Sequence, residues 1–64
     1  MKITLNGEAV ETTATTLADL LSERGFGPKV GTARNGAFVP GALRATTPLA
    51  DGDRIEVVAP MQGG

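Results

Sequence analysis

The stretch that decides the fold is Arg54-Ile55-Glu56-Val57-Val58-Ala59-Pro60-Met61-Gln62-Gly63-Gly64, at the end of a 64-residue chain. In its first part successive side chains alternate between two faces, with Ile55 and Val57 on one face and the side chains next to them on the other. A period of two is typical of a half-buried β-strand. The pattern predicts a strand over residues 54–59.

The last two residues, Gly63 and Gly64, are not expected to form part of the folded domain. Glycine has no side chain and loses more conformational entropy on ordering than any other residue. A pair of glycines at a terminus therefore does not anchor a fold. We expect a folded domain over residues 1–59 and a flexible tail over residues 60–64 that ends in an unhindered carboxylate.

Working outward from the last strand, the start of the chain predicts a β-hairpin. Polar and apolar residues alternate over residues 2–5 and again over residues 8–13. Asn6-Gly7 lies between them, and Asn-Gly is the strongest short signal for a tight hairpin turn.

A short amphipathic helix is predicted over residues 16–25. Thr16 suits the N-cap, because its hydroxyl can accept a hydrogen bond from a free backbone N–H of the first turn. Asp19 places negative charge near the positive end of the helix dipole, and Gly25 suits the left-handed position that ends a helix. One apolar face is formed by Leu17, Leu20 and Leu21.

The middle of the chain predicts two short strands and a crossover. Residues 29–34 and 37–39 are strand-like and are separated by a second turn signal, Asn35-Gly36. Residues 40–48 are expected to form an irregular crossover, with Leu43 and Leu49 covering the core.

The predicted order is a hairpin, a helix, two short strands and a final strand, which buries one sheet face against one helix. The last strand can lie parallel beside the first, in the centre of the sheet. We therefore expect an α+β fold of the β-grasp, or ubiquitin-like, type, with a mixed sheet of four to five strands. The predicted core is Ile3, Leu5, Val10, Leu17, Leu20, Leu21, Ile55 and Val57.

Composition narrows the classes of function. The chain has no Cys and no His, which excludes the usual zinc sites and nucleophiles activated by His. A net charge of −1 without a basic run argues against a nucleic-acid partner. No apolar run approaches the roughly 20 residues of a membrane span, and the residues after Met1 lack the apolar segment and cleavage site of a signal peptide. We expect a cytoplasmic protein that binds neither metal nor cofactor.

The polar groups that could form a site have simpler interpretations. Asp51 and Asp53 could bind a metal, but Asp-Gly-Asp is typical of a turn that enters a strand. The Asn-Gly pairs lack the lysine and following helix of a phosphate-binding loop, and the threonines suit strands and caps. The side chains of Arg34, Arg44 and Arg54 are expected in solvent.

One surface could serve a protein partner. Phe38, Val39 and Val58 could form an exposed apolar patch on the sheet face away from the helix, and such patches mark protein-binding surfaces. At least one of the three is expected in the core, because the chain has few large apolar residues. The predicted partner-binding residues are Gly63, Gln62, Met61, Val58 and Phe38.

The tail permits one specific chemistry. A partner enzyme could use ATP to convert the Gly64 carboxylate to an acyl-adenylate and release pyrophosphate. A sulfur nucleophile, such as an enzyme persulfide, could then displace AMP and give a thiocarboxylate, whereas an amine or thiol would give a ubiquitin-type conjugate. Gly64 is therefore the predicted reactive residue, and ATP is consumed by the partner rather than bound as a cofactor.

Three motifs carry a resemblance to a known family. The chain begins with Met1-Lys2-Ile3-Thr4-Leu5-Asn6-Gly7-Glu8 and ends with Gln62-Gly63-Gly64. Between them, Leu49-Ala50-Asp51-Gly52-Asp53-Arg54-Ile55-Glu56 forms a Leu-x-Asp-Gly-Asp-x-Ile-Glu block, the most specific part. With these motifs nearly the whole chain resembles the ThiS family, the bacterial sulfur carriers of thiamine biosynthesis.

The resemblance implies a carrier protein that is not itself an enzyme. It implies adenylation of Gly64 by an E1-like partner (ThiF), conversion to a thiocarboxylate, and delivery of sulfur to thiazole synthase (ThiG). The sulfur would come from a donor such as a cysteine desulfurase persulfide, and Gly63 would pass through the enzyme's channel. The chain departs from the family near Arg44, where an aromatic residue is common, and at Ala59-Pro60-Met61.

Other functions stay open from the sequence. A carrier of the type found as the small subunit of molybdopterin synthase would use the same thiocarboxylate, although those chains are generally longer. A ubiquitin-like modifier would be attached to lysines of other proteins. A binding module would leave the tail inert.

Overall fold

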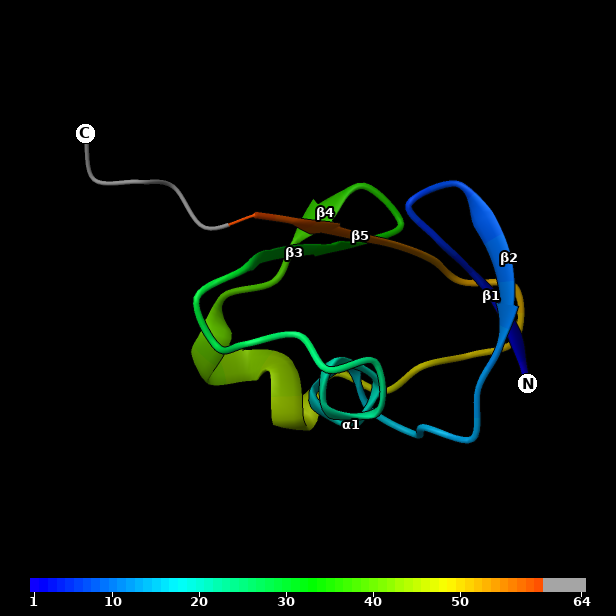
Figure 1. Ribbon diagram of the computed structural model, residues 1–64, viewed down its shortest axis with the longest axis horizontal. Coiled ribbons are helices and arrows are strands. Elements are labelled where there is room, and N and C mark those ends of the chain that lie inside the picture. The colour runs from blue at the N-terminus through cyan, green and yellow to red at the C-terminus, as the bar shows by residue number, and fades with distance from the viewer. Residues whose placement is uncertain (60–64) are drawn as a thin grey trace.

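The computed structural model describes residues 1–59, which form a five-stranded mixed sheet packed on one α-helix. Its spatial order is β2-β1-β5-β3-β4, and the central strand β5 is parallel to β1 and antiparallel to β3. Figure 1 shows the helix on one side of the sheet. The predicted β-grasp fold is confirmed. The elements are β1 (Lys2–Leu5), β2 (Glu8–Glu11), α1 (Leu17–Glu23), β3 (Gly31–Arg34), β4 (Ala37–Phe38), η1 (Gly41–Thr46) and β5 (Arg54–Val58).

Both Asn-Gly pairs form the predicted hairpin turns. The φ angle is +51° at Asn6 and at Asn35, and each following glycine also has a positive φ, as a type I′ turn requires. The two asparagines also bind β5 from opposite sides. Asn6 Oδ1 accepts from the Val57 N–H at 2.8 Å, and Asn35 Oδ1 accepts from the Arg54 N–H at 2.8 Å. The turns therefore fix the central strand as well as their own hairpins.

Helix α1 is capped as predicted at both ends. The Asp19 N–H donates to Thr16 Oγ1 at 3.1 Å. Beyond the last turn, Gly25 has a φ of +75°, and the Phe26 N–H donates to the Leu21 carbonyl at 2.9 Å. This is the geometry of a Schellman motif, which satisfies carbonyls that the helix leaves free.

The core is formed by the inner sheet face and the apolar face of α1. Its buried residues are Ile3, Ala14, Leu17, Leu20, Leu21, Val39, Leu49, Ile55 and Val57. Most of the predicted core is confirmed, but Leu5 and Val10 are only half-buried and pack against the cluster. Val10 lies on β2, an edge strand, and Leu5 is the last residue of β1.

The predicted irregular crossover contains the 3-10 helix η1. Leu49 is buried, as predicted, but the prediction that Leu43 covers the core is wrong, because 52% of it is exposed. The neighbouring Arg44 takes the inward position instead. Its Nε donates to Thr32 Oγ1 at 3.1 Å, and its other nitrogens donate to two backbone carbonyls before β3.

Four predicted strands are shorter than expected. The strand predicted over residues 29–34 begins at Gly31, and the strand predicted over residues 37–39 ends at Phe38. The strand predicted over residues 8–13 ends at Glu11, and the strand predicted over residues 54–59 ends at Val58. Within the part of the chain that the structure describes, no helix is long and apolar enough to cross a membrane. The expected tail, residues 60–64, lies outside the described residues.

Candidate functional site

The predicted site residues fall into two groups. Gly64, the predicted reactive residue, and Gly63, Gln62 and Met61, predicted to bind a partner, lie outside the described residues 1–59. Phe38 and Val58 lie on the sheet and are 73% and 61% exposed. The third apolar residue of that group, Val39, is buried, so the expectation that one of them belongs to the core is confirmed.

Strand pairing brings the exposed residues together on the face away from α1. Gly31 pairs with Val58, and Ala33 pairs with both Glu56 and Phe38. These five residues, with Thr32, line a shallow hollow of about 160 Å³. We call Gly31, Ala33, Phe38, Glu56 and Val58 the outer patch.

Small residues on β3 create the hollow. A Cβ atom at Gly31 would lie 2.9 Å from Val58 Cγ2, closer than real Cβ contacts. The Val58 side chain therefore occupies space that any other residue at position 31 would fill. Gly31 and Ala33 form a low floor between the larger Val58 and Phe38 side chains.

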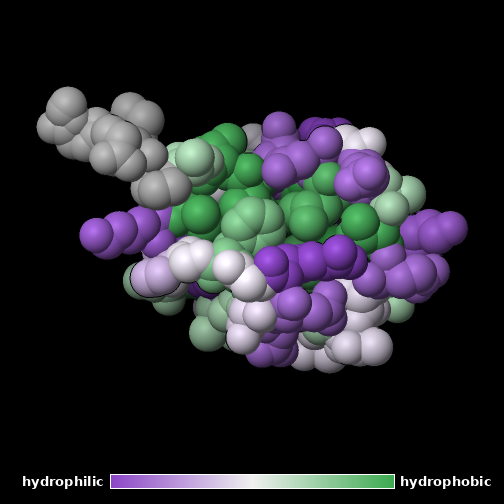
Figure 2. All heavy atoms as spheres, viewed as in Figure 1, coloured by the Kyte–Doolittle hydropathy of each residue, from purple (hydrophilic) through white to green (hydrophobic). Residues whose placement is uncertain are grey.

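The end of β5 borders apolar surface in the space-filling view. Figure 2 shows a band of hydrophobic residues across the middle of the viewed face that reaches the end of β5, with hydrophilic residues along its borders. Val58, the last residue of β5, is one of the few large apolar residues that are more than half exposed.

The other end of β5 is held by a buried carboxylate. Asp53 accepts from Arg34 Nε at 2.8 Å, Asn35 Nδ2 at 3.0 Å and the Ala50 N–H at 2.8 Å. Burial raises the pKa of Asp53, but the hydrogen bonds from Asn35, Ala50 and Arg34 and the charge of Arg34 outweigh it and lower the pKa below its ordinary value. Asp51 Oδ1 accepts from the Lys2 N–H at 2.8 Å. These contacts support the turn interpretation of Asp51 and Asp53.

The expectation that the arginines lie in solvent is wrong for two of them. Arg34 forms an ion pair with Asp53 at 2.8 Å, and Arg44 binds Thr32 and backbone carbonyls. Their partners lie 12 to 19 positions away in the sequence, so no local pattern marks them. Arg54 alone is exposed without a side-chain hydrogen bond or ion pair among residues 1–59.

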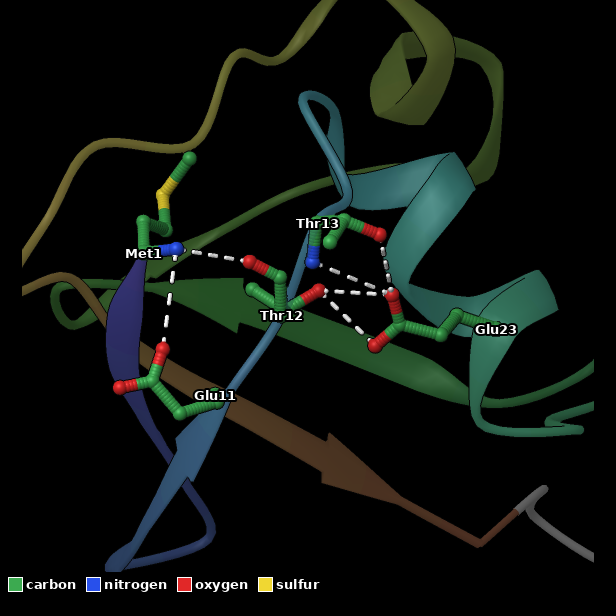
Figure 3. A pocket seen from close by; sticks show the side chains of 5 residues that line it. All are labelled: Met1, Glu11, Thr12, Thr13 and Glu23. Carbon is green, nitrogen blue, oxygen red and sulfur yellow. Dashed lines mark hydrogen bonds and ion pairs between the residues drawn. The ribbon is translucent and has the colours of Figure 1, made fainter.

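A second hollow lies near the N-terminus, as Figure 3 shows. The Met1 amino group donates to the Thr12 carbonyl at 2.8 Å and lies 3.8 Å from Glu11 Oε2. The Thr12 hydroxyl donates to the Glu23 carboxylate, 2.8 and 2.9 Å from its two oxygens, and Thr13 also contacts Glu23. The polar groups around this hollow bond to one another, and the hydrogen bonds from Thr12 to Glu23 connect the end of β2 to α1. No local pattern in the sequence predicts this contact.

A mixed sheet of order β2-β1-β5-β3-β4, with β5 parallel to β1 and one α-helix packed on the sheet, defines a ubiquitin-like β-grasp protein. Comparison with known families gives the particular one. The model of the ThiS family matches residues 3–64, and the chain belongs to this family.

Two solved structures support the assignment. A crystal structure of thiamine biosynthesis protein ThiS from Geobacter metallireducens is 26% identical, with a TM-score of 0.88 and full coverage of both chains. An NMR structure of a thiamine biosynthesis protein from the same organism is 26% identical, with a TM-score of 0.79, and covers this chain fully and 88% of that chain. Among the curated proteins, none matches this chain in sequence.

Proposed function

We propose that this protein is a sulfur carrier for thiazole formation in thiamine biosynthesis, with the Gly64 carboxylate as its reactive group. The observation that carries the proposal is the family match, which extends through Gly64. The likeness to a ThiS structure over the full length of both chains supports it. In this role the protein is a substrate of other enzymes and not an enzyme.

The proposed chemistry occurs in an enzyme partner's active site. The Gly64 carboxylate attacks ATP, which forms an acyl-adenylate and releases pyrophosphate. The terminal sulfur of a persulfide then displaces AMP and forms an acyl disulfide. A thiol cleaves the S–S bond, is oxidised to a disulfide, and leaves the thiocarboxylate. We expect ATP to be bound by the partner and consumed there.

The domain supports this role by its geometry. Gly64 follows Val58 by six positions, and an extended chain of that length spans at most about 20 Å. A partner that receives Gly64 in its active site must therefore dock close to the end of β5. The outer patch lies there, which supports Phe38 and Val58 as partner-binding residues.

The proposed partners follow from the chemistry. They are an E1-like adenylating enzyme, a sulfur donor such as a cysteine desulfurase persulfide, and a thiazole synthase that takes the sulfur. We expect these steps in the cytoplasm, because the activation consumes ATP.

The test is the intact mass of the protein after incubation with ATP, the adenylating enzyme and a sulfur donor. Wild type should gain the mass of one sulfur in exchange for one oxygen. Deletion of Gly64, or addition of one residue beyond it, should abolish the gain. Gly63→Val should slow adenylation because its side chain crowds the channel.

Thermal melting provides the control for these variants. Residues 63 and 64 follow the domain and contribute no side-chain packing, so each variant should melt like wild type. If the Gly64 deletion still gained sulfur, the reactive residue would lie elsewhere. If wild type never gained it, the carrier function would be wrong.

A further inference from the structure

The hollow of the outer patch has an apolar lining and lies beside the exposed acidic residue Glu56. Gly31 and Ala33 form its floor, and Phe38 and Val58 rise on either side. Glu56, whose strand partner is Ala33, lines the hollow with the apolar part of its exposed side chain. A ligand that fills this hollow and also binds the neighbouring carboxylate needs an apolar body and a positive end.

Glu56 has no hydrogen bond or ion pair from its side chain among residues 1–59. Most other carboxylates in this part of the chain do have one: Asp51, Asp53 and Glu23 each accept from nearby donors. Arg54 lies two residues from Glu56 on the same face of β5, yet the two form no ion pair within the described residues. The Glu56 carboxylate is therefore available to an external cation.

We propose that an arginine side chain of the adenylating partner occupies this hollow. Its methylene stem would lie on Gly31 and Ala33, and its guanidinium would pair with the Glu56 carboxylate. The identity of the partner rests on the proposed function, whereas the arginine is inferred from the shape of the hollow and the charge of the exposed Glu56 beside it.

The chemistry of the hollow selects this side chain over its competitors. A purely apolar side chain could fill the hollow, but it would offer no donor to the exposed carboxylate beside it. Lysine provides the charge, but its ammonium is compact and strongly hydrated. A guanidinium is planar, stacks on aromatic rings and donates to a carboxylate through two parallel bonds. The exposed Phe38 ring, at 73%, offers such a stacking surface.

The experiment compares single variants in calorimetric titrations of the adenylating enzyme. Glu56→Gln keeps the size of the side chain and removes its charge, and should weaken binding about tenfold. Phe38→Leu keeps an apolar wall without the ring and should weaken binding about threefold to tenfold. Glu8→Gln is the matched control. Glu8 is exposed and, within residues 1–59, also lacks a side-chain partner, but it lies on β2 at the far edge of the sheet, so its loss should change affinity less than about twofold.

The salt dependence of binding distinguishes the loss of an ion pair from the loss of shape complementarity. Binding of wild type should weaken as salt is raised, and Glu56→Gln should show a shallower dependence because one charge pair is gone. All variants should melt like wild type. Unchanged affinity and salt dependence in Glu56→Gln would overturn the proposal, and so would equal losses in Glu56→Gln and Glu8→Gln.

The proposed function has a separate readout. Wild-type protein at saturating concentration should drive exchange of pyrophosphate into ATP by the adenylating enzyme. If wild type drives the exchange and Glu56→Gln binds normally, the proposed contact between an arginine and Glu56 is wrong and the carrier function stands. If wild type neither binds nor drives exchange, the proposed function fails and the arginine inference fails with it.

Discussion

Val57 and Val58 are adjacent residues of the same type on the same strand, and they have opposite surroundings. Val57 is 6% exposed and belongs to the core, whereas Val58 is 61% exposed on the outer patch. The cause is the two-residue period of a β-strand, which sends successive side chains to opposite faces. One strand therefore supplies both the inner face that stabilises the domain and an outer face that is free to bind.

The acidic residues of this region differ in the same way. Asp53 is 7% exposed and accepts from three donors of its own domain. Glu56 is exposed and has no such donor among residues 1–59. The contrast teaches that burial with satisfied hydrogen bonds marks a structural carboxylate, and an exposed carboxylate beside apolar surface marks a candidate for binding.

The largest expected loss of stability comes from a substitution on the inner face of β5. Ile55 is fully buried, so Ile55→Ala should lower the free energy of unfolding by about 2–5 kcal/mol through lost burial and a cavity. That is a large fraction of the stability of so small a domain. Val58→Ala, from the outer face, should cost less than about 0.5 kcal/mol. Urea unfolding curves measure both, and equal losses would remove the distinction between the faces.

A smaller effect is expected from Asp53→Asn. At neutral pH the variant should lose about 1–3 kcal/mol, because the change weakens a buried, charge-assisted network. The folded state lowers the pKa of Asp53 below its ordinary value of 3.8. Its contribution is therefore present above that value and is lost as the pH falls through the lower, folded-state pKa.

The pH dependence distinguishes this role from simple packing. Wild type should lose stability as the pH falls below about 4, and the stability of Asp53→Asn should fall less steeply over that range. Thermal melting at a series of pH values makes the comparison. Parallel curves for the two proteins would show that Asp53 does not contribute through its charge.

A smaller loss of stability than for Asp53→Asn is expected from Gly31→Ala. The added Cβ would lie 2.9 Å from Val58 Cγ2, but Val58 is exposed and its side chain can shift. The cost should be about 0.5–1 kcal/mol, while the raised floor partly fills the hollow and should weaken partner binding. A variant that unfolds at much lower urea would place Gly31 among the structural residues.

Local patterns in the sequence predicted most of the fold. Alternation marked β1 and β5, Asn-Gly marked both hairpin turns, and Thr16 and Gly25 marked the ends of α1. Each of these signals acts within a few residues, so it can be interpreted without knowledge of the tertiary structure.

Features set by distant contacts could not be predicted in the same way. Leu43 lies on a 3-10 helix, and Arg44 takes the inward position because acceptors on and before β3 are brought to it by folding. The hollow of the outer patch likewise depends on the pairing of Gly31 with Val58 across β3 and β5. The sequence indicated Phe38 and Val58 as candidates, but not the small floor or the available carboxylate beside them.

The central claim is that the outer face of β5 serves binding and not folding, and Val58→Asp tests it most directly. The measurement is a calorimetric titration of the adenylating enzyme with wild type and with Val58→Asp, after both proteins are shown to melt at similar temperatures. The account predicts affinity at least about tenfold weaker for the variant, because its charge would be desolvated without a partner. Equal affinity of the two proteins would contradict the claim and remove this face from the interface.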